Sequence, residues 1–102
     1  MRDLLSFLGM ARRAGKLIMG DKAVAESAHS AKLICTAEDL APGSLGRAIK
    51  AAHRGNVPII TLPYGKEEIG RALGRTTCGI LALTDDGFAV QVAKTAGERQ
   101  EG

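Results

Sequence analysis

Two short and almost unbroken apolar runs constrain the fold of this 102-residue chain more than any other feature. Residues 33–37 read Leu-Ile-Cys-Thr-Ala, and residues 78–84 read Cys-Gly-Ile-Leu-Ala-Leu-Thr. The first run is typical of a central strand that is covered on both faces, and the second is expected to form the last strand. Since segments with helical spacing lie between them, we expect helices on both faces of one sheet.

Two further segments complete the expected sheet. Residues 16–19 form a short extended run, and residues 57–62 form another with Pro58 near its start, where a missing N–H is tolerated. Helices that alternate with these strands predict an α/β protein, a three-layer α/β/α sandwich. We expect one domain over residues 1–95, followed by a flexible polar tail over residues 96–102.

Apolar residues at spacings of three and four predict the helices between the strands. The first helix buries Leu4 and Leu8 and is ended by Gly15. The third is expected to bury Ile49, and the last to be short. The residues expected to cap the second, third and last helices are Asp21, Ser44 and Asp85 with Asp86.

Composition limits the classes of partner and chemistry. The net charge of +3 is too small to support more than weak nucleic-acid binding unless the basic residues are favourably placed. Tyr64, Phe7 and Phe88 are the only aromatic residues, so a base-stacking platform is not expected. Cys35 and Cys78 form no CxxC pair, so we expect reduced thiols, no metal and no cofactor.

The same reasoning gives expectations for location and catalysis. No apolar run is long enough to cross a bilayer, and residues 1–5 are followed by no secretory signal pattern, so we expect a cytoplasmic protein. His29 and His53 have no carboxylate or Cys at ligand spacing, and no nucleophile–base pair stands out. We therefore expect no enzymatic activity.

A basic stretch near the start of the chain points to RNA. Arg12 and Arg13 end the first helix, Lys16 begins the extended run, and Gly20 opens the second helix, which together make a compact place to hold a polyanion. The alternative for the basic residues is that they favour a helix C-terminus and its dipole. Lys22 opposes the dipole of the second helix, which is easier to understand if a phosphate lies nearby.

Five short landmarks occur along the chain. They are residues 8–16 (Leu-Gly-Met-Ala-Arg-Arg-Ala-Gly-Lys), Gly20, residues 37–39 (Ala-Glu-Asp), Val57-Pro58 and residues 66–74 (Lys-Glu-Glu-Ile-Gly-Arg-Ala-Leu-Gly). In this order and at these separations they resemble the ribosomal protein L-seven-Ae/L-thirty-e superfamily, and most closely its small bacterial YlxQ-type members, over nearly the whole chain up to about residue 94. The resemblance implies a four-stranded mixed sheet between helices, no enzymatic activity, and binding of structured RNA, typically kink-turns, through loops at one edge.

The chain departs from the superfamily at the start of the second helix. RNA-binding relatives read Gly-x-Asn-Glu-x-x-Lys there, whereas this chain places Lys22, Ala23 and Glu26 at the Asn, Glu and Lys positions. Strict kink-turn recognition is therefore in question, although Lys22 can still contact a guanine edge or a phosphate.

The resemblance also assigns two further loops to the RNA. Glu38 and Asp39 accept hydrogen bonds from base amino groups in this interpretation, and the alternative is that they bind lysines or cap a turn. Arg75, Thr76 and Thr77 precede the last strand, where relatives place a loop that touches a flipped-out nucleotide; the alternative is an ordinary polar connection.

A basic row on the third helix is interpreted differently. Arg47, Lys50 and Arg54 recur at spacings of three and four. Relatives use this helix little for RNA, so a solvated face is the preferred interpretation, with a contact to the ribosome or to a protein as the alternative.

We therefore expect a cytoplasmic, non-enzymatic and monomeric protein that docks bent or looped RNA, with ribosomal RNA and the ribosome or its assembly proteins as partners. A protein-interaction module with a decayed RNA site is the second hypothesis, and a small α/β enzyme or nucleotide binder the third. The residues assigned to RNA are Lys16, Gly20, Asp21, Lys22, Glu38, Asp39, Arg75, Thr76 and Thr77.

Overall fold

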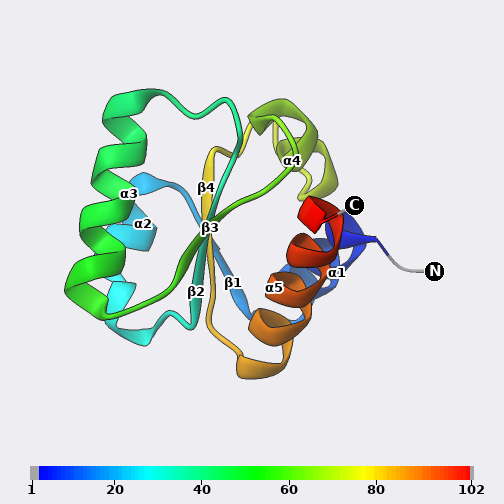
Figure 1. Cartoon of the computed structure of the whole chain (residues 1–102), viewed down its shortest axis with the longest axis horizontal. Helices are drawn as coiled ribbons and strands as arrows, with labels where there is room; N and C mark the ends of the chain where they lie inside the picture. The colour runs from blue at the N-terminus through cyan, green and yellow to red at the C-terminus, as the bar shows by residue number, and fades with distance from the viewer. Residues whose placement is uncertain (1–2, 102) are drawn as a thin grey trace.

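The computed structural model describes the backbone of residues 3–101 and the side chains of residues 3–97. Helices and strands alternate along the chain, with one short 3-10 helix after the second α-helix (Figure 1). In chain order the elements are α1 (Leu4–Arg13), β1 (Leu17–Met19), α2 (Asp21–Glu26), η1 (Ala28–Ser30), β2 (Leu33–Thr36), α3 (Pro42–Gly55), β3 (Ile59–Thr61), α4 (Lys66–Ala72), β4 (Ile80–Leu83) and α5 (Asp86–Glu101).

The four strands form one mixed sheet in the order β1-β4-β2-β3. Strand β4 pairs antiparallel with both β1 and β2, and β2 pairs parallel with β3. The two central strands, β2 and β4, are buried at every position. The prediction that residues 33–37 form a covered central strand is therefore confirmed.

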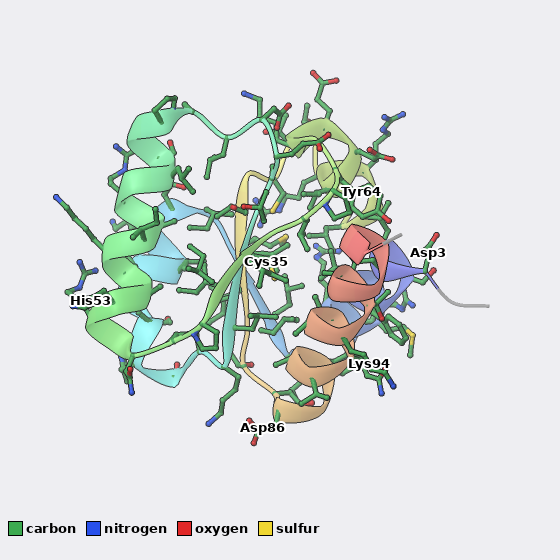
Figure 2. All side chains as sticks on the ribbon, in the orientation of Figure 1. Asp3, Cys35, His53, Tyr64, Asp86 and Lys94 are labelled. Carbon is green, nitrogen blue, oxygen red and sulfur yellow. The ribbon has the colours of Figure 1, made fainter. Side chains whose placement is uncertain are left out.

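Helices cover both faces of the sheet. Figure 1 shows α2 and α3 on one side and α1, α4 and α5 on the other. Alternate residues of β2 point into different cores: Cys35 packs with Leu8 and Val92 on the α1–α5 side, and Ile34 packs with Ala52 on the α3 side. Figure 2 shows Cys35 between these layers. The three-layer α/β/α sandwich and the four-stranded mixed sheet are as expected.

Several local signals act as the sequence predicts. The backbone at Gly74 has a φ of +75°, in the left-handed region that ends a helix, just after α4. The Phe88 N–H donates to Asp85 Oδ2 at 3.0 Å, which confirms Asp85 as a cap of α5.

Other caps and faces differ from the predictions. The N-cap of α2 is Gly20, whereas Asp21 is the first helical residue and makes no capping hydrogen bond. Helix α3 begins at Pro42, because proline fits the first turn of a helix, so Ser44 lies inside that turn. Ile49 is 50% exposed, because it lies about 100° around the helix from the buried face formed by Ala48 and its neighbours.

The last helix is longer than expected. Helix α5 runs through Glu101, so residues 96–101, predicted as a flexible polar tail, continue the helix. The reason is packing: Ala89, Val92 and Ala96 are buried on the side of α5 that contacts α1. Among the described residues, no helix has the length and hydropathy needed to cross a membrane.

Candidate nucleic-acid interface

Most of the residues assigned to RNA lie at one end of the sheet. Gly20 follows β1, Glu38 and Asp39 follow β2, and residues 75–77 precede β4. Since β4 runs antiparallel to both neighbours, its N-terminal end meets the C-terminal ends of β1 and β2. We call this the Gly20 end of the sheet.

A hollow of about 220 Å³ at this end joins two of the predicted segments. Gly20 and Asp21 line it from the start of α2, and Arg75 and Thr77 line it from the loop before β4. The Gly20 N–H donates to the Ile80 carbonyl at 3.0 Å, which fixes the two segments against each other. Gly20 adopts a φ of +99°, which favours glycine strongly.

The Arg75–Thr77 loop is held by backbone contacts with α4. The Arg75 N–H donates to the Gly70 carbonyl at 2.7 Å, and the Cys78 N–H donates to the Lys66 carbonyl at 2.9 Å. A Cβ on Gly70 would lie only 2.6 Å from the Cα of Thr77, so the helix and the loop are in direct backbone contact. The exposed side chains of Arg75, Thr76 and Thr77 therefore project from a fixed loop.

Arg12 approaches this loop from α1. Its guanidinium lies beside Gly74, 3.3 Å from the position that a Cβ on that residue would occupy. The sequence grouped Arg12 with Arg13 and Lys16 as a candidate phosphate contact, and nothing local shows that α1 packs against α4. The structure adds this guanidinium to the surroundings of the Arg75–Thr77 loop.

Lys16 does not belong to the same cluster. Its carbonyl accepts a hydrogen bond from the Thr84 N–H, at the end of β4 that is opposite to Ile80. Three extended residues lie between Lys16 and Gly20, so the four residue-to-residue steps span about 13 Å. Lys16 and Gly20 therefore lie at opposite ends of β1, and the assignment of Lys16 to RNA stays a prediction.

The two acidic residues after β2 have different surroundings. Asp39 Oδ1 accepts a hydrogen bond from the Lys66 N–H at 2.9 Å, so this carboxylate binds a free amide in the first turn of α4. The side chain of Glu38 is exposed, and its backbone N–H donates to the Tyr64 carbonyl at 2.9 Å. The capping role that the sequence left open for Asp39 is thus present.

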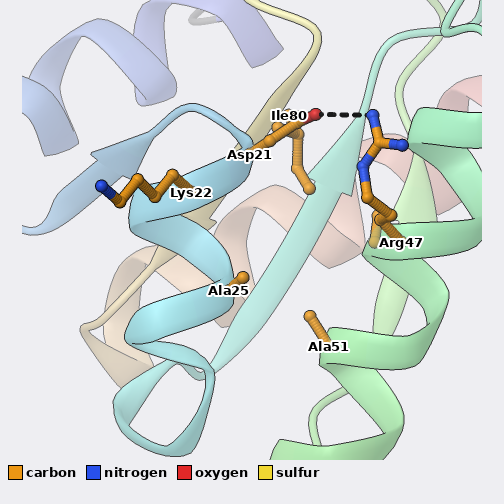
Figure 3. Close-up of a pocket in the computed structure, with 7 residues that line it drawn as sticks. Asp21, Lys22, Ala25, Arg47, Ala51 and Ile80 are labelled. Carbon is orange, nitrogen blue, oxygen red and sulfur yellow. Dashed lines mark hydrogen bonds and ion pairs between the residues drawn. The ribbon is translucent and has the colours of Figure 1, made fainter.

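Asp21 and Lys22 point in different directions from the start of α2. The carboxylate of Asp21 accepts a hydrogen bond from Arg47 Nη2 on α3 at 3.3 Å (Figure 3). Lys22 is exposed and extends away from α3 (Figure 3). Ala25 and Ala51 line the 270 Å³ hollow between the two helices.

The environment of the two thiols at and behind this end favours their protonated form. Both cysteines are free and buried. Burial raises the pKa of Cys35, and burial is also the main reason that the pKa of Cys78, which lines the hollow beside Arg75, is raised. No cluster of His, Cys, Asp and Glu suited to a metal ion occurs among the described residues.

This α/β/α sandwich, with loops from three segments gathered at one sheet end, has the architecture of the ribosomal protein L-seven-Ae/L-thirty-e superfamily. No family model matches the chain. The RNA-binding protein YlxQ of Bacillus subtilis (strain 168) is 34% identical to it over 88 residues, which cover 80% of this chain and 83% of that protein. The chain belongs to the YlxQ family within this superfamily.

Two solved structures support the fold. A Bacillus halodurans protein of unknown function superposes with a TM-score of 0.85 at 22% identity, over 92% of this chain and 96% of that one. The Giardia lamblia 15.5 kD RNA-binding protein superposes with a TM-score of 0.71 at 19% identity, over 96% of this chain and 85% of that one. At these identities the two structures establish the fold alone.

Proposed function

We propose that this chain is a non-enzymatic RNA-binding protein that docks a bent or looped RNA at the Gly20 end of the sheet. The observation that carries the proposal is the hollow that Gly20 and Asp21 share with Arg75 and Thr77, which come from distant parts of the chain. The name of the Bacillus subtilis relative, an RNA-binding protein, supports the same class.

The chemistry of these side chains suits RNA. A guanidinium such as that of Arg75 pairs with phosphate or with a guanine edge, and hydroxyls such as that of Thr77 bond to phosphate and sugar oxygens. The side chain of Lys22 extends away from α3 (Figure 3) and is available to a second strand of the RNA. The residues proposed to contact RNA are Gly20, Asp21, Lys22, Glu38, Arg75, Thr76 and Thr77, with Asp39 acting mainly through the position of α4.

The preferred RNA in this proposal is structured ribosomal RNA bound in the cytoplasm, by a monomer. The two free cysteines are consistent with a reducing compartment. Lys22, Ala23 and Glu26 replace the Asn, Glu and Lys of the kink-turn frame, so we propose that Lys22 and Arg75 supply the contacts that this frame provides in relatives.

A titration at two salt concentrations tests the proposal. The purified protein is titrated into a kink-turn RNA, a matched straight duplex and a single strand, because phosphate-only binding weakens steeply with salt whereas shape recognition retains a preference. We expect the kink-turn RNA to be preferred at both concentrations. Binding to none of the three RNAs would overturn the proposal.

A pair of charge-matched variants locates the site. Lys22→Glu is expected to weaken binding to the preferred RNA at least tenfold, because it places a like charge against phosphate. Lys94→Glu changes the charge equally on the outer side of α5, on the opposite layer (Figure 2), and is expected to have little effect. Equal losses of RNA affinity in the two variants would mean that the affinity depends only on the net charge of the protein.

A second candidate function is a protein-interaction module. An open hollow of about 560 Å³ lies between α1 and α5, and the half-buried side chains of Phe7, Met10 and Phe88 line it. Affinity capture that recovers the same protein partner after nuclease treatment, and loses it with Phe88→Ser, would favour this candidate. Loss of the partner on nuclease treatment would favour the RNA proposal.

A further inference from the structure

The net charge of the chain resides on one helix. The chain has 14 Lys and Arg and 11 Asp and Glu. Helix α3 (Pro42–Gly55) contains three of the basic residues and no acidic residue, so the rest of the chain is balanced and the excess of +3 corresponds to α3 alone. A helix with a single sign of charge attracts polyanions more strongly than the net charge of the whole protein suggests.

The three basic residues, Arg47, Lys50 and Arg54, form one stripe, here called the α3 basic stripe. Their spacing of three and four residues places them on one side of the helix, over about 10 Å of its length. All three are exposed, whereas the opposite face of α3 packs on the sheet through Ala48 and Ala52. The stripe is therefore exposed to solvent on α3, which with α2 forms one outer layer of the sandwich (Figure 1).

The stripe is largely without counter-charges. Arg47 pairs with Asp21 at 3.3 Å, and this is the only ion pair among the described residues. Lys50 and Arg54 have no such partner within the same part of the chain. Two neighbouring cations that no carboxylate neutralises are available to an external anion at low desolvation cost.

The stripe is continuous with the Gly20 end of the sheet. Arg47 lies near the start of α3, and its guanidinium reaches the first residue of α2, beside the hollow that Arg75 lines. From Arg47 the stripe runs along α3 toward the other end of the sheet. An RNA stem that leaves the Gly20 end on the side of α2 and α3 would thus pass over Lys50 and Arg54.

We propose that the α3 basic stripe is a second RNA contact, which binds the phosphates of a stem flanking the RNA element docked at the Gly20 end. This proposal rests on the proposed function. It also specifies the side of the protein on which the flanking stem lies, because only a stem on the α2–α3 side reaches the stripe. The contact carries no sequence information, since Lys50 and Arg54 meet phosphates rather than base edges. Its contribution is affinity that weakens with salt.

The test uses a double variant that leaves the Gly20 end intact. Lys50→Gln with Arg54→Gln keeps the Arg47–Asp21 pair. Its control, Arg71→Gln with Lys94→Gln, removes the same charge from exposed positions on α4 and α5, in the opposite layer. Both are titrated with a kink-turn RNA with short stems and with two versions in which one or the other stem is extended by about ten base pairs.

We expect the stripe variant to bind the short-stem RNA as the wild type does, and to bind one of the two extended RNAs about tenfold more weakly. The slope of log affinity against log salt for that RNA should fall by about 1.5 to 2, as expected for two lost phosphate contacts. The control should change neither quantity by a comparable amount.

The failures of the two proposals are distinguishable. If the wild type binds no RNA, the proposed function fails, and this inference with it. A different set of results overturns this inference alone: the wild type binds RNA, Lys22→Glu weakens binding, and the stripe variant matches its control on every RNA. The Gly20 end is then the whole RNA site. In that case the stripe is left for an acidic protein partner.

Discussion

The guanidinium of Arg47 and the carboxylate of Asp21 meet at 3.3 Å, and this contact joins α3 to the start of α2. Both side chains are largely in water, with 66% and 44% of their surface exposed. Arg47 also donates to the hydroxyl of Ser44 at 3.0 Å, so its position is set from within α3 as well. The pair therefore orients one cation beside the Gly20 end without burying any charge.

Removing this pair should matter little for stability. Because exposed ion pairs contribute about 0–1 kcal/mol, we expect Arg47→Gln to lower the free energy of unfolding by less than about 1 kcal/mol. The measurement is urea denaturation at low and at high salt, with Lys50→Gln, which has no ion-pair partner in the described structure, as the control. A loss well above that limit would show that the pair acts as a buried contact does.

Glycine at position 70 should be required for the loop before β4. A Cβ there would lie 2.6 Å from the Thr77 Cα, which is backbone and cannot rotate away, so Gly70→Ala should cost about 1–3 kcal/mol despite the better helix propensity of alanine. RNA affinity should fall as the loop shifts. Thermal unfolding and RNA titration of the same sample give both quantities.

The control for this prediction is Gly46→Ala. Gly46 lies within α3, and a Cβ there has no neighbouring atom within 4 Å. Alanine should therefore stabilise the protein by about 0.5–1 kcal/mol. If Gly70→Ala stabilises the protein as Gly46→Ala does, the close contact between Gly70 and Thr77 does not exist in solution.

The two acidic residues after β2 should separate into a structural and a binding role. Asp39→Ala removes the acceptor for the Lys66 N–H and should lower the free energy of unfolding by about 1 kcal/mol. Glu38→Ala should leave stability unchanged, since the Glu38 side chain is exposed, and should alter RNA binding alone. Denaturation curves and RNA titrations of both variants are the measurement. An Asp39→Ala protein with the same free energy of unfolding as the wild type would contradict the capping role.

The cysteines should be unreactive in the folded protein. Since burial raises the pKa of both thiols, the thiolate fraction at pH 8 is smaller than in the unfolded chain, and iodoacetamide should label both slowly. Cys78 retains 7% of its surface and lines the hollow at the Gly20 end, so bound RNA should slow its labelling further and leave that of Cys35 unchanged. Mass spectrometry of labelled peptides distinguishes the two residues. RNA that protects neither thiol would argue against docking at this hollow.

Elements whose evidence is local were predictable. The apolar run of β2 can be buried only between two layers. The positive φ of Gly74 suits the end of α4. The carboxylate of Asp85 accepts a hydrogen bond from the free backbone N–H three residues ahead. Each depends on residues within one turn or one strand. For the same reason the resemblance to the superfamily could be recognised from short landmarks in order.

Choices between equally good local signals were not predictable. Asp21 and Ser44 are suitable caps, but the N-cap of α2 is Gly20, and α3 begins at Pro42. The phase of α3 is set by the contact of Ala51 and Ala52 with their surroundings, which turns Ile49 outward. Helix α5 continues through Ala96 because it packs against α1. No local sequence pattern indicates that these two helices are in contact.

The candidate site shows the same division. The sequence identified Gly20, Lys22 and the Arg75–Thr77 loop as residues with suitable chemistry, because donors and flexible backbone can be read one position at a time. The strand order brings β4 between β1 and β2, which places Arg75 beside Gly20. The parallel pairing of β2 with β3 gives Asp39 the amide of Lys66. These are pairings between distant parts of the chain, which the free energy of the whole packed core selects and no local window contains.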